Sequence, residues 1–259
     1  MRTLRILANR FVMAFSLLTR LPAGQGDLPS ENEIARSAIF FPTVGIAIGL
    51  LMAVSDAVSA RALGPWFSAI VALFVEFLLT GGMHIDGLMD TADGMMSGRT
   101  RERTIEIMHD SRVGPMGAAS CVFMIAAKIA LIASTSGSVR WMSLVFSPAM
   151  SRLALVWAFT AFPPVTPGQG MGSLFAKRVG LGEAGVASAY IVALCYVAAG
   201  PISIAVTAGA VGAALIVGCR ISVFLGGVNG DVYGTLCEIA ELASLAIFAQ
   251  SGLTWANLG

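Results

Sequence analysis

The chain has 259 residues, of which 56% are hydrophobic and only 12% are charged, and its formal net charge is +1. A mean hydropathy of +0.82 excludes an ordinary soluble domain, which could not bury that much apolar surface, and indicates an integral membrane protein. The small net charge provides no basic surface for nucleic acid, so we expect no nucleic-acid partner.

The first 36 residues are predicted to form an interfacial segment. Residues 4–18 are apolar apart from a few polar and basic positions such as Arg5 and Arg10, and the run is too short and too basic at its start to span a bilayer. We expect an amphipathic helix lying on the membrane surface. A secretory signal is the competing interpretation, and it is disfavoured because no small-residue cleavage site precedes Thr19.

About seven apolar segments follow, and most of them approach the roughly 20 residues that a spanning helix needs. They are residues 39–63, 66–83, 116–134, 141–162, 184–199, 202–225 and 236–255, and the fifth is the shortest. The predicted fold class is therefore all-α, a polytopic membrane helix bundle that forms a single catalytic domain over residues 1–259.

The positive charges predict the orientation of this bundle. With a cytoplasmic N-terminus, twelve of the sixteen Lys and Arg residues lie in cytoplasmic segments, whereas only Arg61 and Arg140 lie outside. This bias is the one expected for cytoplasmic loops. The long connections at 84–115, 163–183 and 226–235 then share the cytoplasmic face, where we expect the chemistry to occur. Asp56, near the outer end of the first span, is expected at the interface.

Residues 81–94 read GGMHIDGLMDTADG and contain three acidic residues in register. On a helix, the i, i+4, i+7 spacing places Asp86, Asp90 and Asp93 on one face, where like charges repel unless a cation is bound. Mg²⁺ prefers such oxygen ligands and commonly bridges to substrate phosphates. Asp110, four residues after Glu106, repeats the spacing and is predicted to be a fourth ligand.

Several arginines accompany this acidic segment, and guanidinium groups suit a phosphorylated substrate. They are Arg99, Arg101, Arg103 and Arg112. Two structural interpretations stay open: the aspartates belong to a solvated loop, and the arginines only set the topology. His84 is either a ligand or base, or a structural hydrogen-bonding residue.

A second acidic motif covers residues 226–242, GGVNGDVYGTLCEIAEL. Asp231 is expected in a glycine-rich turn, and Glu238 and Glu241 fall within the last span. Carboxylates at bilayer depth are costly and are usually functional, and their expected partners are Lys128 and Arg152 in other spans. A structural ion network is the alternative interpretation, and it would include Glu76.

These motifs carry a resemblance to a known family. GGMHIDGLMDTADG, followed by RTRERTIEIMHDSRVGPMG, resembles the signature of the cobalamin synthase family of adenosylcobinamide-GDP ribazoletransferases. LLTRLP, FFPTVGIAIG, GMGSLFAK and GGVNGDVYGTLCEIAEL are similar to further motifs of that family, so the resemblance covers nearly the whole chain.

The resemblance implies a Mg²⁺-dependent multi-pass enzyme of the bacterial inner membrane. It would join adenosylcobinamide-GDP to α-ribazole, or to α-ribazole 5′-phosphate, release GMP, and yield adenosylcobalamin or its 5′-phosphate. The lipid bilayer and neighbouring corrinoid-pathway enzymes are the other expected partners, and homo-oligomerisation stays open.

The expected roles follow from this reaction. The catalytic residues are expected to be His84, Asp86, Asp90, Asp93 and Asp110, the four aspartates holding Mg²⁺. The substrate-binding residues are expected to be Arg99, Arg103, Arg112, Lys128, Arg152, Asn229, Asp231 and Glu238. The 5′-oxygen of the ribazole is expected to attack, with His84 or an acidic group as its base.

Two other functions are compatible with parts of this sequence. An ion-coupled transporter would use the charges within the spans as its pathway. An enzyme similar to the CDP-alcohol phosphotransferases would use Asp90, Asp93 and Asp110 for metal with another substrate. Its pattern is matched imperfectly, because Glu106 stands where an Asp is usual and the arginine comes late, at Arg99.

Overall fold

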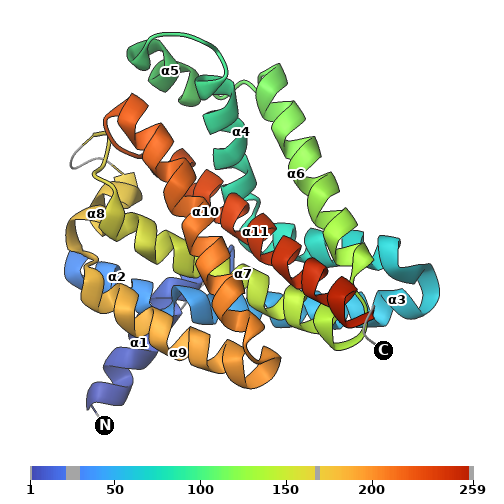
Figure 1. The fold of residues 1–259 in the computed structure, drawn as a ribbon. Coiled ribbons are helices and arrows are strands. Elements are labelled where there is room, and N and C mark those ends of the chain that lie inside the picture. Colours follow the sequence, from blue (N-terminus) through green and yellow to red (C-terminus); the bar gives the residue numbers. More distant parts are fainter. Residues whose placement is uncertain (1, 22–29, 167–169, 257–259) are drawn as a thin grey trace.

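The computed structural model describes residues 2–21, 30–166 and 170–256, and in this part of the chain every regular element is helical. The helices are α1 (Arg2–Leu18), α2 (Glu31–Ser37), α3 (Phe41–Thr80), α4 (Met83–Met95), α5 (Arg101–Met108), α6 (Pro115–Ser134), α7 (Gly137–Ala161), α8 (Gly170–Arg178), α9 (Leu181–Ala199), α10 (Ile202–Leu225) and α11 (Gly230–Ala256), and a 3-10 turn, Ala38–Phe40, precedes α3. The predicted all-α class is confirmed (Figure 1).

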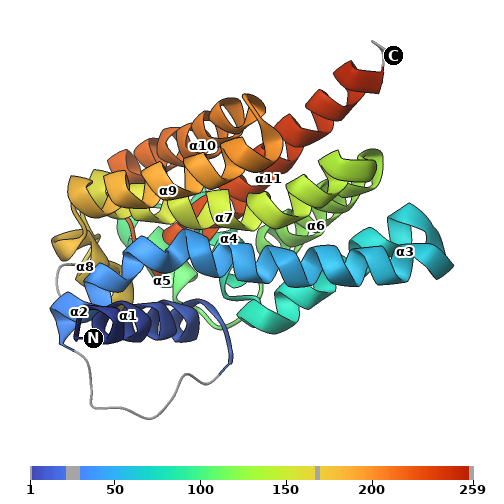
Figure 2. The same cartoon turned by 90° about the horizontal axis from the view of Figure 1, so that it is seen from below.

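Helix α7 forms the centre of the bundle. It packs against α3, α9, α10 and α11, and most of its side chains are buried. Figure 2 shows α7 between α3 on one side and the α9–α10 pair on the other. A spanning helix buried all round needs small contact residues, because membrane helices associate through close backbone packing rather than through a hydrophobic driving force.

Two glycines in the first half of α3 provide this close packing. A Cβ on Gly45 would lie 2.4 Å from the carbonyl oxygen of Pro148 in α7, and one on Gly49 would lie 2.4 Å from that of Val145. The two glycines are four residues apart, so they lie on the same face of α3. The FFPTVGIAIG stretch thus fixes α3 against the central helix.

Helix α3 is a hairpin rather than a continuous rod. Gly64 has φ 74° and ψ 175°, outside the helical region, and Pro65 follows it. Asp56 and Ser68 would lie about 18 Å apart along a straight helix. Both nevertheless bond the same guanidinium, that of Arg140, at 2.6 and 2.8 Å. The chain therefore folds back at Gly64.

The predicted spans agree with this architecture. Six helices of the described residues are long and apolar enough to cross a membrane, and one of them, Glu31–Thr80, contains the bend at Gly64. Counted as two halves, it gives the seven predicted spans. The chain is a multi-pass membrane protein. The fifth span is longer than expected, since α9 has 19 residues.

Two segments expected as loops or turns are helical. Residues 84–115 contain α4 and α5, and Asp231 lies in the first turn of α11 rather than in a turn before it. Asp56 is 5% exposed and paired with Arg140, which is itself buried, so it faces the interior of the bundle, and its position at the membrane interface stays a prediction.

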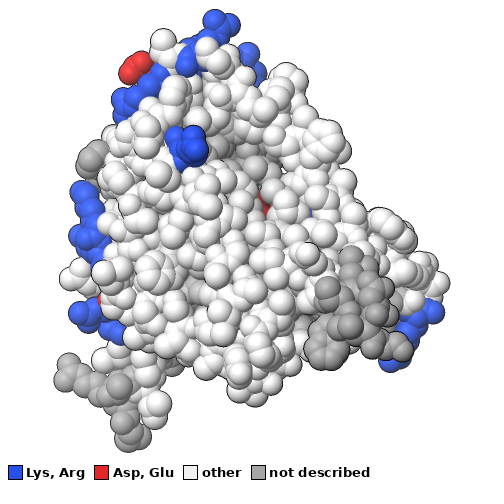
Figure 3. Space-filling model, viewed as in Figure 1, with Lys and Arg blue, Asp and Glu red and all other residues white. Residues whose placement is uncertain are grey.

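The surface charges are unevenly distributed. Lys and Arg atoms gather over α5 and along the edge formed by α8, whereas the face over α9, α10 and α7 is almost entirely white (Figure 3). Helix α1 lies beside α2 and the start of α3, and an ion pair between Arg10 and Glu33 at 2.8 Å ties α1 to α2. This arrangement fits an interfacial N-terminal segment.

Candidate active site

The site begins where α3 gives way to α4. Gly81 and Gly82 have φ values of 67° and 72°, which favour glycine, and they turn the chain sharply between the two helices. Helix α4 then carries Asp86, Asp90 and Asp93 on one face, as the spacing predicts. Asp86 is exposed, while Asp90 and Asp93 are half-buried.

Asp90 is the electrostatic centre of this row. Partial desolvation, followed by the negative charges of Asp231, Asp86 and Asp93, raises the pKa of Asp90 to about 6, and the charge of His109 opposes the shift. Four carboxylates from α4 and α11 thus act on one another. Like charges gathered in this way favour a bound proton or a bound cation.

Close contact between α4 and α11 brings Asp231 to the row. A Cβ on Gly87 would lie 2.7 Å from the carbonyl oxygen of Asp231, and the Thr235 hydroxyl donates to the Gly87 carbonyl at 3.1 Å. Asn229 caps α11 by accepting from the Val232 amide at 3.0 Å, and its side-chain amide donates to Asp231 at 3.0 Å. Asn229 therefore orients Asp231 and begins the helix that carries it.

Asp93 has a second role that its spacing does not indicate. Its carboxylate accepts from the backbone amides of Gly114 and Gly117 at 2.7 and 2.8 Å. These amides belong to the start of α6, where the first four N–H groups have no partner within the helix. Asp93 thus caps α6 from a neighbouring helix.

The outer residues of the predicted site pair locally. Asp110 accepts from the guanidinium of Arg112 at 2.6 Å, which lowers the pKa of Asp110 to about 2, and it does not act on Asp90. Arg103 pairs with Glu106 at 2.6 Å. Arg99 is exposed, and its guanidinium has no partner among the described side chains. Arg103 and Arg112 are both exposed, so each guanidinium could release its carboxylate partner and bind a phosphate instead.

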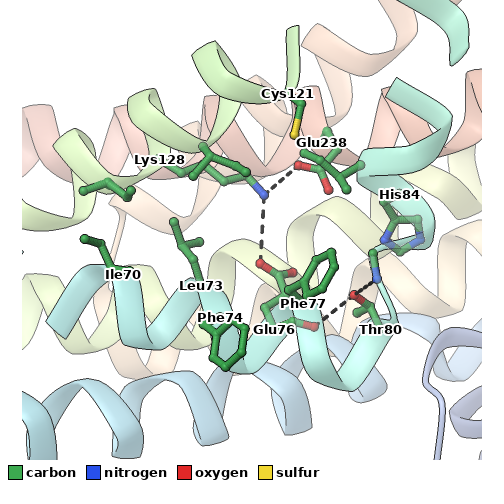
Figure 4. Close-up of a pocket in the computed structure, with 14 residues that line it drawn as sticks. Ile70, Leu73, Phe74, Glu76, Phe77, Thr80, His84, Cys121, Lys128 and Glu238 are labelled. Carbon is green, nitrogen blue, oxygen red and sulfur yellow. Dashed lines mark hydrogen bonds and ion pairs between the residues drawn. The ribbon is translucent and has the colours of Figure 1, made fainter. Parts of the chain in front are cut away.

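Lys128, Arg152 and Glu238 lie elsewhere, in a buried ion network behind α4. The network also contains Glu76 and Glu241, so it joins four helices: α3, α6, α7 and α11. The Lys128 ammonium lies 2.8 Å from both Glu238 and Glu241 and 3.9 Å from Glu76 (Figure 4). The expected partners of the intramembrane glutamates are confirmed.

Arg152 completes this network from the central helix. Its side chain is fully buried, and one guanidinium nitrogen lies 2.9 Å from Glu241 and 3.1 Å from Glu76. Three carboxylates therefore face two cations. Because each of these charges has an oppositely charged partner within 3.1 Å inside the bundle, the geometry favours a structural role over direct substrate contact.

His84 belongs with this network rather than with the aspartate row. Successive helical residues are about 100° apart, so His84 and Asp86 project in nearly opposite directions from α4. Burial, followed by the positive charge of Arg152, lowers the pKa of His84 to about 3, so its imidazole is neutral. Figure 4 shows His84 beside Glu238 and Thr80.

His109, which the sequence analysis did not single out, is the imidazole nearer the acidic row. It ends α5 and is exposed, and its charge acts on both Asp90 and Asp231. Only its place in the IEIMHD stretch, next to Asp110, could have indicated it.

The donor chemistry of the row fits a hard cation such as Mg²⁺. Asp86, Asp90 and Asp231 offer carboxylate oxygens, and their mutual repulsion shows in the raised pKa of Asp90. No three His, Cys, Asp or Glu side chains of the described residues converge closely enough to enclose a metal by themselves. Mg²⁺ does not require such a cage, since it usually takes one or two carboxylates and keeps water and substrate phosphates as its other ligands.

Comparison with known proteins gives a consistent result. The family model described as cobalamin-5-phosphate synthase matches residues 10–249. An adenosylcobinamide-GDP ribazoletransferase of Roseiflexus sp. (strain RS-1) is 36% identical over 92% of this chain and 88% of its own length. One from Thermoanaerobacter pseudethanolicus is 33% identical, with 95% and 98% coverage, and one from Pseudomonas savastanoi pv. phaseolicola is 33% identical, with 92% and 98%.

No solved structure gives a significant match to this chain. The family model nevertheless covers most of the 259 residues, including both acidic motifs and the helices that carry the ion network. The resemblance seen in the motifs is confirmed, and the chain belongs to the cobalamin-5-phosphate synthase family.

Proposed function

We propose that the chain is an adenosylcobinamide-GDP ribazoletransferase of cobalamin biosynthesis, with Asp86, Asp90 and Asp231 at its reaction centre. The observation that supports this is the carboxylate cluster around Asp90 on the face of α4 that meets α11 and α5. A diphosphate substrate needs positioning and charge neutralisation more than covalent catalysis, and such a cluster provides the anchor for both.

The reaction is a displacement at phosphorus. A ribose hydroxyl of the ribazole forms a new P–O bond to the phosphate that carries the corrinoid, the P–O bond of the diphosphate breaks, and GMP leaves. The expectation that the 5′-oxygen attacks does not hold for a phosphorylated acceptor. The family description, cobalamin-5-phosphate synthase, indicates a product that keeps its 5′-phosphate, so another ribose hydroxyl must attack.

Mg²⁺ is the cofactor of this proposal. Asp86, Asp90 and Asp231 would hold it, and when bound it neutralises charge on the diphosphate and on the departing GMP. Asp93 supports the site by fixing the start of α6 against α4. Asp110 is placed here with Arg112 as part of the surrounding surface, because its carboxylate is already paired.

Three arginines are the phosphate-binding groups of the proposal. Arg99 is free, and Arg103 and Arg112 lie on the exposed surface of the same region. Their present acidic partners are exposed, and such pairs are worth little, so a phosphate can replace them. Asn229 acts indirectly, by orienting Asp231.

The proton of the attacking hydroxyl needs an acceptor near the row. We assign this role to His109 rather than His84, because His109 acts on Asp90 and Asp231 whereas His84 faces the opposite side of α4. His109 lies at the end of α5, the short helix that packs against α4.

We place the enzyme in the bacterial inner membrane with this face toward the cytoplasm. The arginines of α5 and the basic end of α8 lie along one edge of the molecule (Figure 3), and α5 packs against α4, which carries the aspartate row. This agrees with the bias of positive charges toward the cytoplasm. The bilayer then holds the amphipathic corrinoid donor near the site, and neighbouring enzymes of the pathway are the expected protein partners.

The test is turnover by the purified protein in proteoliposomes. We expect GMP release that requires adenosylcobinamide-GDP, an α-ribazole acceptor and Mg²⁺ together. Corrinoid flux across the membrane without GMP release would instead support the transporter. A CDP-alcohol donor accepted in place of adenosylcobinamide-GDP would support the other phosphotransferase class. The ion pairs of the buried network favour the enzyme, since each charged group of the network has an oppositely charged partner among the described residues.

A further inference from the structure

A cavity of about 240 Å³ lies behind α4, on the side of His84. Its walls are mainly apolar and come from the second half of α3 and from α6, and its inner end is polar (Figure 4). The apolar walls include Ile70, Leu73, Phe74, Phe77, Ile125 and Ile129. The polar end is formed by Glu76, His84, Lys128 and Glu238. Concave apolar sites with a few polar groups are typical of small-molecule binding.

His84 gives this cavity a free polar group. The residue is only 7% exposed and lines the cavity, yet its imidazole makes no hydrogen bond to any described residue. An imidazole ring offers one donor and one acceptor when neutral. Buried polar side chains nearly always have a partner, so a ligand that presents a complementary ring nitrogen or hydroxyl is expected here.

The size of the cavity limits what it can hold. A cavity of about 150 Å³ is known to accommodate benzene, so 240 Å³ has room for a two-ring aromatic group. A corrin, built from four five-membered rings joined in a macrocycle, is too large. The carboxylates of Glu76 and Glu238 at the polar end disfavour a phosphate there.

We propose that this cavity binds the benzimidazole base of the α-ribazole acceptor; the proposal rests on the function proposed above. The His84 ring donates its N–H to the one unsubstituted nitrogen of the base. Phe74 and Phe77 contact the aromatic rings, for which offset or edge arrangements are favourable. The ribose points out of the cavity, past Ile85 and toward Asp86.

This placement brings the acceptor to the aspartate row. Ile85 lines the cavity and stands on α4 between His84 and Asp86, since each residue turns about 100° around the helix. A helix is about 10 Å across with its side chains, which is comparable to the length of a nucleoside. With its base beside His84, the acceptor extends past Ile85 and presents its ribose to Asp86.

Two matched tryptophan variants of α6 test the site. Ile125 lines the cavity and is 41% exposed, whereas Val122 is 65% exposed on the same helix and does not line it. Ile125→Trp should weaken equilibrium binding of α-ribazole at least tenfold, measured by titration calorimetry without donor. It should raise KM for α-ribazole without changing KM for adenosylcobinamide-GDP. Val122→Trp should change neither the binding of α-ribazole nor its KM.

A second experiment tests the hydrogen bond from His84. An indole riboside has the same shape as a benzimidazole riboside but lacks the free ring nitrogen. His84→Phe should weaken binding of the benzimidazole riboside about tenfold, the loss expected for one buried hydrogen bond. The His84→Phe protein should bind the indole riboside with the same affinity as the wild type. Equal losses for both ligands would overturn the assignment of His84.

The outcomes separate this inference from the proposed function. If the wild type releases GMP and Ile125→Trp binds α-ribazole normally, the cavity assignment is wrong and the enzyme assignment stands. If mass spectrometry finds a co-purified lipid that Ile125→Trp displaces while α-ribazole binding is unchanged, the cavity is a lipid site. If the wild type binds α-ribazole in this cavity without any GMP release, the cavity assignment stands and the reaction is wrong.

Discussion

Helix α4 separates two acidic groups that differ in their counter-charges. On one side, Asp86, Asp90, Asp93 and Asp231 act on one another, and none of them forms an ion pair with a Lys or Arg of the described residues. On the other side, Glu76, Glu238 and Glu241 are bonded to Lys128 and Arg152. An acidic group that is paired with Lys and Arg inside the bundle stabilises the fold, whereas a group without such partners is available to bind a cation. The following changes test that contrast.

Asp90→Asn should have the largest effect on activity. It keeps the size of the side chain but removes the central charge of the uncompensated group. We expect GMP release to fall roughly a thousandfold, the loss typical of removing one key electrostatic group from an active site. Folding, judged by gel filtration and circular dichroism, should be unchanged. Near-normal Mg²⁺-dependent turnover would show that the reaction centre lies elsewhere.

Lys128→Met should have the largest effect on stability. It leaves three buried carboxylates around Arg152 alone, and breaking a buried ion pair in this way typically costs about 3–5 kcal/mol. The free energy of unfolding in detergent should fall by about that amount. Glu238→Gln is the matched control, because it leaves two carboxylates facing two cations. A smaller loss for Lys128→Met than for Glu238→Gln would contradict the structural role of the network.

Asp93→Ala should have an intermediate effect, because Asp93 belongs to both the row and the start of α6. Loss of the cap on the Gly114 and Gly117 amides should cost about 1–2 kcal/mol of stability. Hydrogen exchange should quicken at the start of α6. Asp93→Asn, which keeps one acceptor oxygen, should lose less. Unchanged exchange in Asp93→Ala would show that the cap is dispensable.

The smallest expected effect is the dependence of the folded state's stability on pH. The pKa of Asp90 is about 6 in the folded protein against an ordinary value of 3.8, so the folded state keeps a proton that the unfolded chain releases. Ionisation of Asp90 therefore opposes folding, and stability falls as the pH rises from about 4 to about 6.

Melting temperatures of the wild type and Asp90→Asn check this sign. The variant should melt higher than the wild type at pH 7, and the two should converge only as the pH falls below 3.8, where Asp90 becomes protonated in the unfolded chain as well as in the folded protein. Mg²⁺ should raise the melting temperature of the wild type at pH 7 and narrow the difference. A variant that is less stable than the wild type at pH 7 would contradict the raised pKa.

Local patterns predicted the features that depend on one helix. The i, i+4, i+7 spacing placed Asp86, Asp90 and Asp93 on one face of α4, and the cost of charge at bilayer depth paired Glu241 with Lys128. The seven spans followed from hydropathy, apart from their exact ends. These features need no knowledge of how helices pack, so periodicity and transfer energies suffice for them.

Features that depend on packing between helices could not be predicted in this way. Nothing in the local pattern shows that Asp93 caps α6, that the side of α4 with His84 meets the buried ion network, or that His109 approaches Asp90. These depend on how α4 crosses α6 and α11, which the contact at Gly87 fixes. Motif spacing identifies residues that share a helix face, but it does not indicate what that face meets.

The bend of α3 at Gly64 has a consequence for biogenesis. Asp56 finds its counter-ion in Arg140, which the ribosome adds 84 residues later and which also bonds Pro65 and Ser68. The hairpin that opens the bundle can therefore not complete its packing until α7 has been synthesised. The first two spans therefore complete their packing only after α7 has been inserted. Until then, the Asp56 carboxylate is either solvated or in contact with the insertion machinery.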